Sequence, residues 1–412
     1  MAKEFQQSLM DQDVQECPWP LYRTIRDEHP VYLDPKTGFY IITRYDDVVK
    51  ALRMTDVLSS KVGMQRATSD AVQRVYDQEG YGSMLDTLST NDPPSHTRYR
   101  GLVDRSFVAP RVKGMETHIH EVVHRLIDAF IDDGTTDIHL SFSVPLPMTI
   151  IADQLGVPHE DMASFTAWSN ATSAVMVGLM ATEEEQIAYA RSIVEFQHYF
   201  VEQIEKLRKD PTDDMLSMLI AAQVDNERPL DTTELLSVIQ HVLVAGNETT
   251  TNALSAGIHL LINNPEQARK LREDESLYGQ AAEEILRVDS PVQGLFRVAL
   301  EDVEFSGAKI PQGSVISVSF GCANHDDRRF EDPERFDIGR KNARRHIAFG
   351  QGTHFCIGAM LARSELVIGL QAINERLDNL RLSVPEEALR HVPSLALRGY
   401  QALPVAFEKA SI

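Results

Sequence analysis

The sequence has 412 residues, of which 43% are hydrophobic and 25% charged, ordinary values for a folded protein with a large core. Acidic residues outnumber basic residues 61 to 40, which argues against nucleic-acid binding because phosphate neutralisation needs a basic surface. No apolar stretch approaches the roughly 18 residues of a membrane span, and the charged N-terminus does not resemble a signal peptide, so we expect a soluble protein without membrane attachment.

Helical patterns dominate the chain. Residues 38–45 predict a strand, and residues 162–210 predict one or two long helices that end at Pro211. A capping-box pattern at Asp231 and Glu234 begins a helix that ends before Pro265. At 1.5 Å per residue this helix is roughly 45–50 Å long, and because it is apolar around much of its circumference we expect it to be buried.

Strand patterns return near the C-terminus. Residues 303–320 predict a β-hairpin with its turn at 311–313, and residues 402–407 predict a further strand. The sequence therefore predicts a mainly α protein with a small β lobe. We expect residues 1–20 to form an N-terminal extension and residues 21–412 to form a single domain.

Three cysteines, Cys17, Cys322 and Cys356, are far apart, which indicates a reducing, cytoplasmic setting and not a disulfide framework. Cys356 lies in FGQGTHFCIG (349–358), among three glycines and directly before a helical pattern. Unpaired N–H groups and the helix dipole favour a thiolate there. A single thiolate is a poor zinc site but a good axial ligand for haem iron; an inert buried cysteine is the alternative.

The spacing of this loop resembles the haem-binding loop of the cytochrome P-450 superfamily. The matching residues are Phe349, Gly352, His354, Cys356 and Gly358. The resemblance extends from about residue 20 to the end of the chain and implies a triangular helical prism around a buried haem. It implies a bacterial-type monooxygenase that activates O2 at haem b (iron protoporphyrin IX), with Cys356 on the iron. Phe349, Gly350 and Gly358 would contact the haem.

Two further motifs follow the order of that family. In AGNETT (245–250) the resemblance implies that Ala245 and Gly246 make room for O2, and that Glu248 and Thr249 relay protons; a simple helix bend is the alternative. Many relatives have Asp in place of Glu248. The resemblance also implies a buried structural cluster made by Glu284, Arg287 and Arg335. It assigns the haem propionates to His96, Arg100, Arg297 and His354.

The resemblance places an apolar substrate pocket at Leu85, Leu88, His241, Val244, Gln293, Leu295 and Phe296. We therefore expect a hydrophobic small molecule, such as a terpenoid, an aromatic compound, a steroid or a fatty acid. A core histidine bonded to its neighbours is the alternative for His241. Rival functions are a haem-thiolate peroxygenase and a haem-binding sensor without turnover; the Glu248-Thr249 pair argues against the peroxygenase.

Electrons are expected from NAD(P)H through a ferredoxin or flavodoxin and its reductase, with the chain as a monomer. A basic cluster would steer that acidic partner, unless these residues form only a solvated face: Arg98, Arg105, Arg111, Lys113, Arg344 and Arg345. HEVVH (120–124) matches a zinc-protease motif. No later glutamate ligand occurs before Glu160, so we interpret it as a solvated helix face. Cys322 is expected to pack in a strand or at its exit.

Overall fold

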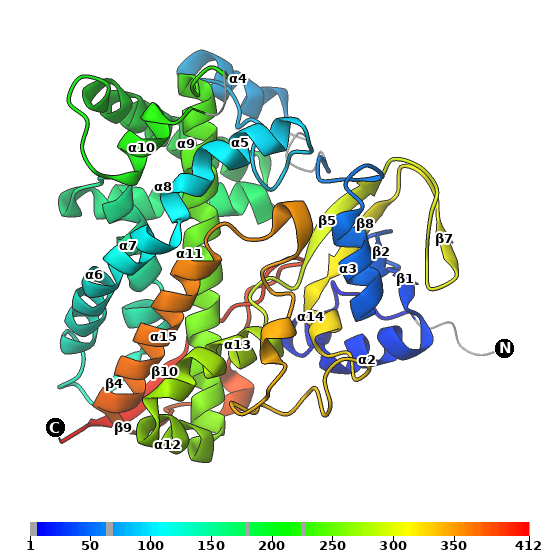
Figure 1. Ribbon diagram of the computed structural model, residues 1–412, viewed down its shortest axis with the longest axis vertical. Coiled ribbons are helices and arrows are strands. Elements are labelled where there is room, and N and C mark those ends of the chain that lie inside the picture. The colour runs from blue at the N-terminus through cyan, green and yellow to red at the C-terminus, as the bar shows by residue number, and fades with distance from the viewer. Residues whose placement is uncertain (1–5, 63–68, 178–180, 224–226, 412) are drawn as a thin grey trace. The chain divides into compact units, whose positions relative to one another are not determined.

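The computed structural model describes residues 6–62, 69–177, 181–223 and 227–411. The chain forms two compact units built from interleaved segments. The first contains Met1–Ser59, Gly114–Pro147 and Glu248–Ile412, and the second contains Ser60–Lys113 and Met148–Asn247. Three helices carry the chain from one unit to the other, α6 (Ala109–Asp128), α7 (Pro145–Gln154) and α11 (Thr232–Asn263) (Figure 1).

The first unit holds three small sheets. The largest has the strand order β1-β2-β8-β5-β3, in which β2 and β8 are parallel and the other neighbours are antiparallel. The second has the order β4-β10-β9, and the third pairs β6 with β7. The strands are β1 (Val31–Leu33), β2 (Tyr40–Ile42), β3 (Leu58–Ser59), β4 (Thr135–Asp137), β5 (Gly294–Ala299), β6 (Val303–Phe305), β7 (Ala308–Ile310), β8 (Val315–Ser319), β9 (Leu377–Leu382) and β10 (Pro404–Lys409).

The predicted hairpin at residues 303–320 has a different turn from the one expected. Strands β6 and β7 pair across Ser306 and Gly307, whose φ angles of 47° and 79° are typical of a two-residue hairpin turn. The expected turn at 311–313 instead connects β7 to β8, and β8 pairs with β5 and β2. The predicted strands at 38–45 and 402–407 are confirmed as β2 and β10.

Helices surround the sheets of the first unit. They include α1 (Gln12–Glu16), α2 (Trp19–Glu28), α3 (Tyr45–Arg53), α12 (Pro265–Glu273), α13 (Tyr278–Val288), α14 (Phe320–Asn324) and α15 (Ala359–Arg376). One apolar cluster joins α3 to the five-stranded sheet through Val48, Ile316 and Phe330. A second cluster holds the N-terminal segment against β2, because Leu9 and Val14 pack with Ile41.

The second unit contains helices and loops and no strand in its described residues. It contains α4 (Asp70–Glu79), α5 (Ser95–Val103), α8 (Met162–Val177), α9 (Glu183–Leu207) and α10 (Met215–Ala221). The expectation of one or two long helices over residues 162–210 is confirmed by α8 and α9. Helix α4 packs on α9 through Val72, Val75 and Ile193.

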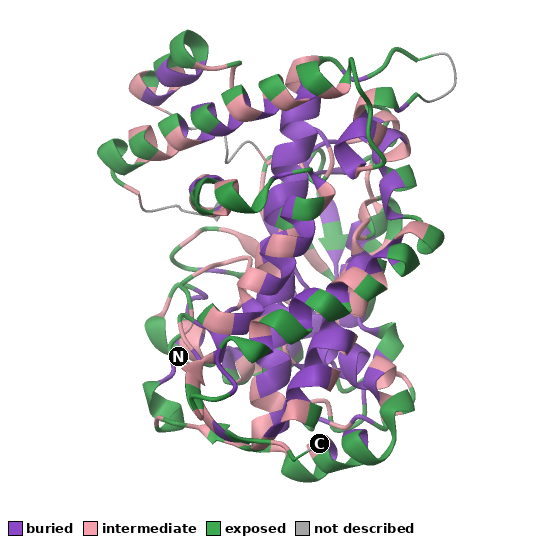
Figure 2. Ribbon diagram, turned by 90° about the vertical axis from the view of Figure 1, so that its left-hand side faces the viewer, coloured by how far each residue is buried: buried purple, intermediate pink, exposed green. Residues whose placement is uncertain are grey.

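Helix α11 begins with the predicted capping box. The Asp231 N–H donates to Glu234 Oε2 and the Glu234 N–H donates to Asp231 Oδ1, both at 2.9 Å. The helix is buried along most of its length (Figure 2) and ends at Asn263, two residues before Pro265 begins α12. The predicted mainly α class with a small β part is therefore confirmed.

Candidate active site

The loop around Cys356 folds back on itself. The Cys356 N–H donates to the Phe349 carbonyl at 2.9 Å, and the Gly350 N–H donates to the Ile347 carbonyl at 2.9 Å. Cys356 is half-buried and lies two residues before Gly358, the N-cap of α15. None of the three cysteines forms a disulfide bond. The sulfur-bearing residue thus comes just before a helix start, as predicted, and is partly accessible.

The glycines of this loop serve different purposes. Gly350 and Gly352 have φ angles of 68° and 70°, which a glycine adopts without strain. A Cβ on Gly352 would also come within 3.1 Å of the Leu52 carbonyl oxygen. Gly358 differs, because its φ of −84° is ordinary and, apart from its two sequence neighbours, no described residue lies within 4 Å of an added Cβ. Open space at Gly358 is compatible with a flat ligand passing close to the backbone.

A short stretch of α11 is more accessible than its surroundings. Ala245 is exposed, and Gly246, Glu248 and Thr249 are half-buried, whereas nearly all the preceding turns are buried. Helix α11 is continuous through this motif. An added Cβ on Gly246 would lie 2.8 Å from Ile151 Cδ1, so packing against α7 also requires glycine there.

The residues predicted to bind propionates lie in both units. In the first, the Arg297 guanidinium is almost fully buried and its Nη1 donates to the Phe296 carbonyl at 2.7 Å, while His354 is half-buried in a 3-10 turn next to Cys356. In the second, His96 and Arg100 lie on α5. Burial lowers the pKa of His96, and Arg100 donates to Asp104 at 2.7 Å. A buried guanidinium suits an anionic group, so Arg297 fits a haem propionate.

Comparison with known proteins decides the family. The family model described as Cytochrome P-450 matches residues 166–394, more than half of the chain. The chain is 37% identical to 6-deoxyerythronolide B hydroxylase of Saccharopolyspora erythraea over 78% of each protein. The chain belongs to the cytochrome P-450 family.

Other cytochromes P-450 agree over nearly the whole chain. Steroid C26-monooxygenase of Mycobacterium tuberculosis is 34% identical over 94% of this chain and 92% of its own. The solved structure of a cytochrome P-450 from Chondromyces apiculatus has a TM-score of 0.88 and 33% identity, and the alignment covers 99% of both chains. The predicted fold and monooxygenase activity are therefore confirmed, and membership of the family implies the use of haem and O2. No helix in the described ranges is long and apolar enough to cross a membrane.

The buried ion-pair cluster of this cytochrome P-450 differs from the predicted one in a single residue. Arg287 donates from Nε and Nη2 to Glu284 at 2.7 and 2.8 Å, as expected. The second guanidinium on Glu284 belongs to Arg340, whose Nε donates at 2.9 Å. The prediction of Arg335 is wrong, because its side chain is exposed and only its carbonyl accepts hydrogen bonds from Arg287 and Arg340.

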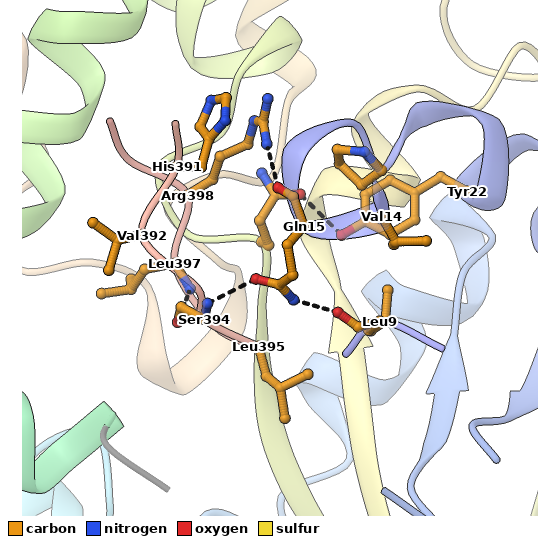
Figure 3. A pocket seen from close by; sticks show the side chains of 12 residues that line it. Leu9, Val14, Gln15, Tyr22, His391, Val392, Ser394, Leu395, Leu397 and Arg398 are labelled. Atoms are coloured by element: carbon orange, nitrogen blue, oxygen red, sulfur yellow. Dashed lines mark hydrogen bonds between the residues drawn. The ribbon is translucent and has the colours of Figure 1, made fainter. Parts of the chain in front are cut away.

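Gln293, predicted to line the substrate pocket, has a structural role instead. Its Oε1 accepts a hydrogen bond from the Tyr22 hydroxyl at 2.9 Å, and its Nε2 donates to the Ser290 carbonyl at 2.7 Å. Gln293 also lines a cavity of about 30 Å³ between residues 9–22 and 391–398, where Gln15 bridges Leu9 and Ser394 (Figure 3). That volume holds about one water molecule and no substrate.

The next predicted pocket residues pack within the β lobe. Leu295 packs against the apolar cluster of the five-stranded sheet. The Phe296 ring makes an edge-to-face contact with Phe39, with ring centroids 5.7 Å apart. The sequence analysis did not predict β5, which carries both residues, and no local pattern pointed to the distant partner Phe39.

In the second unit, His241 is a core residue. Its Nδ1 lies 2.9 Å from the Thr87 hydroxyl and its Nε2 lies 2.8 Å from the Ser89 hydroxyl. Burial lowers the pKa of His241 to about 4. The alternative of a core histidine bonded to its neighbours is thus the one observed. Among the remaining predicted pocket residues, Leu85 is exposed, Leu88 is half-buried and Val244 is buried.

The structure also places the zinc-protease motif HEVVH and the two cysteines other than Cys356. His120 and His124 are exposed on α6, and no group of three metal-ligating side chains occurs in the described part of the chain. HEVVH is therefore a solvated helix face, as expected. Cys322 is buried at the exit of β8, and Cys17 is exposed.

The predicted basic cluster is partly neutralised. Arg98 contacts Glu234 at 2.8 Å and Glu227 at 2.7 Å, and Arg111 contacts Asp213 at 2.9 Å. Arg105, Lys113, Arg344 and Arg345 are exposed. The sequence analysis expected Arg98 and Arg111 to present positive charge to a redox partner. Their ion pairs with Glu234, Glu227 and Asp213 contradict that part of the prediction.

Proposed function

We propose that this cytochrome P-450 binds haem through the Cys356 thiolate and oxidises a hydrophobic small molecule with O2. The proposal is supported chiefly by the accessibility of two motifs, the cysteine loop (349–358) and AGNETT (245–250). Cys356 is partly accessible beside the open space at Gly358, and Ala245, Glu248 and Thr249 interrupt the burial of α11.

The haem site is assigned to residues that suit its chemistry. When bound, haem supplies the iron at which O2 is activated. The Cys356 thiolate would be the protein ligand of that iron, and its electron density would favour the oxygen chemistry that haem supplies. Open space at Gly358 admits the flat ring, as does the loop formed by Phe349 and Gly350. Positive or hydrogen-bonding side chains hold the propionates: His96, Arg100, Arg297 and His354.

Proton delivery is assigned to the accessible stretch of α11. The overall reaction consumes O2, two electrons and two protons, and yields one hydroxyl group on the substrate and one water. The Glu248 carboxyl group passes protons inward, and the Thr249 hydroxyl donates and accepts a hydrogen bond in turn. Ala245 has no side-chain atom beyond Cβ, and Gly246 has none, which leaves room for O2 beside the helix.

Electrons come from NAD(P)H through a ferredoxin or flavodoxin and its reductase. Acidic carriers of this kind suit the exposed cations that remain after Arg98 and Arg111 are set aside, among them Arg344 and Arg345. We propose a cytoplasmic, monomeric protein in which residues 21–412 act as one haem domain; three cysteines without a disulfide bond are consistent with a reducing compartment.

The substrate class is narrowed by the names of the relatives. One is a 6-deoxyerythronolide B hydroxylase and another is a steroid C26-monooxygenase. Both names describe oxidation of large, mostly apolar molecules. We therefore rank a macrolide or other polyketide first and a steroid second, ahead of small aromatic compounds, terpenoids and free fatty acids.

Spectroscopy tests the proposal in two steps. The reduced, CO-treated protein is expected to show the thiolate-type Soret band, and Cys356→Ser is expected to lose it while keeping its far-UV circular dichroism. A compound panel is then screened for the low-to-high-spin shift, and hits are incubated with NADPH and a surrogate ferredoxin system. Absence of the thiolate-type band in the unaltered protein would refute haem-thiolate ligation. Product with peroxide but not with NADPH would favour the peroxygenase.

A further inference from the structure

Helix α13 carries two consecutive buried glutamates. Glu284 accepts hydrogen bonds from Arg287 and Arg340, and this cluster joins α13 to residues 331–340. Glu283 is equally buried, with 4% of its side chain exposed. Successive helical residues point about 100° apart, so Glu283 has separate partners and a separate task.

The hydrogen-bond partners of Glu283 are His346 and Arg363, and the exposed Arg344 also lies 3.9 Å from its Oε1. His346 Nε2 donates to Glu283 Oε2 at 2.9 Å. Arg363 donates from Nε to Oε1 at 2.7 Å and from Nη2 to Oε2 at 3.2 Å, a side-on pair that fixes the plane of its guanidinium. Burial alone would raise the pKa of Glu283, but the hydrogen bonds from His346 and Arg363 outweigh it and lower the pKa to about 2.

His346 connects Glu283 to the backbone just before the cysteine loop. Its Nδ1 accepts a hydrogen bond from the Ala348 N–H at 3.1 Å, so the ring is neutral with its proton on Nε2. Between them, the Ile347 N–H donates to Asn324 Oδ1 at 2.8 Å. The backbone at 346–348 is therefore fixed by side chains from α13 and α14.

Arg363 lies on α15, after the cysteine loop, and contacts the first residue of that loop. Its guanidinium carbon lies 4.5 Å from the centroid of the Phe349 ring, within the range of a cation–π contact. The Phe349 carbonyl accepts the Cys356 N–H at 2.9 Å. The side chain that Glu283 holds in place thus packs on the residue whose backbone holds Cys356.

We infer that Glu283 is a positioning residue for Cys356, holding the start of the cysteine loop through His346 and Arg363 so that the thiolate stays on the haem iron. The inference rests on the proposed thiolate ligation. It assigns Glu283 a task that the neighbouring Glu284 does not perform, because the Glu284 partners lie outside the loop.

Glu283→Gln is the sharpest perturbation, because it preserves shape and removes the charge. An amide offers one acceptor oxygen and one donor nitrogen, whereas His346 and Arg363 present only donors to it. At least one hydrogen bond is lost, and the Arg363 charge loses its counterion. The matched control is Glu234→Gln in the second unit. Glu234 also forms ion pairs with two arginines, Arg98 and Arg228. Burial alone would raise the pKa of Glu234, but the hydrogen bonds from these arginines lower it to about 2.

The experiment follows the loss of the thiolate-type band of the reduced CO complex in haem-loaded proteins. Each protein is incubated below its own unfolding midpoint, measured by far-UV circular dichroism. Glu283→Gln is expected to convert to the non-thiolate form at least about tenfold faster than the unaltered protein, a difference of only ~1.4 kcal/mol in barrier. Glu234→Gln is expected to lose stability but convert at the unaltered rate. Arg363→Lys is the substitute variant if Glu283→Gln does not fold, because it keeps the positive charge but cannot form the side-on pair. It is expected to accelerate conversion, but less strongly than the effect expected of Glu283→Gln.

Each outcome bears on a different claim. Conversion of Glu283→Gln and Arg363→Lys at the unaltered rate would overturn the positioning role. Equal acceleration in Glu234→Gln would also overturn it, since the effect would then follow general stability. Absence of the thiolate-type band in the unaltered protein would instead refute the proposed function, before Glu283 is tested.

Discussion

Glu365 on α15 is a buried carboxyl group whose protonation state governs stability. It is 1% exposed, and its Oε2 has no hydrogen-bond partner among the residues that the structure describes. One turn later on the same helix face, Gly369 packs against Leu254 and Leu146, so the surroundings are apolar. Burial raises the pKa of Glu365 from its ordinary 4.5 to about 8. At pH 7 this carboxyl group is mostly protonated in the folded protein.

The magnitude follows from linkage between protonation and folding. Because the folded pKa lies above the unfolded one, the stabilising contribution of protonation is complete below about pH 4.5 and is lost as the pH rises through 8. At about 1.4 kcal/mol per pH unit, the loss reaches ~3 kcal/mol at pH 7 and ~5 kcal/mol at pH 8. Relaxation around the charge lowers these limits, so we expect roughly 2–4 kcal/mol at pH 8.

Glu365→Gln removes this pH dependence, since an amide does not ionise. Relative to the unaltered protein, its free energy of unfolding is expected to be nearly equal at pH 4.5 and about 2–4 kcal/mol higher at pH 8. Urea unfolding followed by circular dichroism across this range measures the difference. Glu375→Gln, an exposed position on the same helix, is the control and should leave the profile unchanged. A difference that is constant with pH would refute the reasoning.

Three other predictions concern named contacts. Arg340→Ala is expected to cost about 3–5 kcal/mol in urea unfolding because it removes a partner of buried Glu284, while exposed Arg335→Ala should cost under about 0.5 kcal/mol; equal costs would restore Arg335 to the cluster. Because the folded pKa of His241 is lowered from 6.5 to about 4, the unaltered protein should lose up to ~3 kcal/mol as the pH falls between these values. His241→Asn should not show that loss, and parallel profiles would contradict the assignment. Thr249→Ala is expected to lower product formed per NADPH by about tenfold or more, and unchanged coupling would remove Thr249 from the proton relay.

Features that depend on local spacing were predictable from sequence. The capping box of Asp231 and Glu234 is set by residues three apart, and so is the pairing of Glu284 with Arg287. The position of Cys356 just before a helix follows from the helical pattern after it. Each of these needs only the helix period and the chemistry of a few neighbouring side chains.

Features that depend on a distant partner were not predictable. Arg335 and Arg340 lie in one irregular loop, and only the path of that loop decides which guanidinium turns toward Glu284. The family resemblance alone assigned Gln293 and Phe296 to the pocket. Their partners, Tyr22 and Phe39, lie more than 250 residues away in sequence, so no local pattern could reveal them.

The pair Glu283-Glu284 shows how one helix turn serves two loops. Both carboxylates are buried, and each is compensated by its own cations, so neither can exchange partners without leaving a buried charge. The Glu284 cluster closes on residues 331–340, whereas the Glu283 cluster closes on 346–363, which includes Cys356. The side-chain hydrogen bonds of Glu283 and Glu284 go to different residues in the described part of the chain. We therefore expect loss of the Glu284 contacts to weaken the fold, and loss of the Glu283 contacts to loosen the proposed ligation by Cys356. The two effects are therefore separable by spectroscopy, although the residues are adjacent.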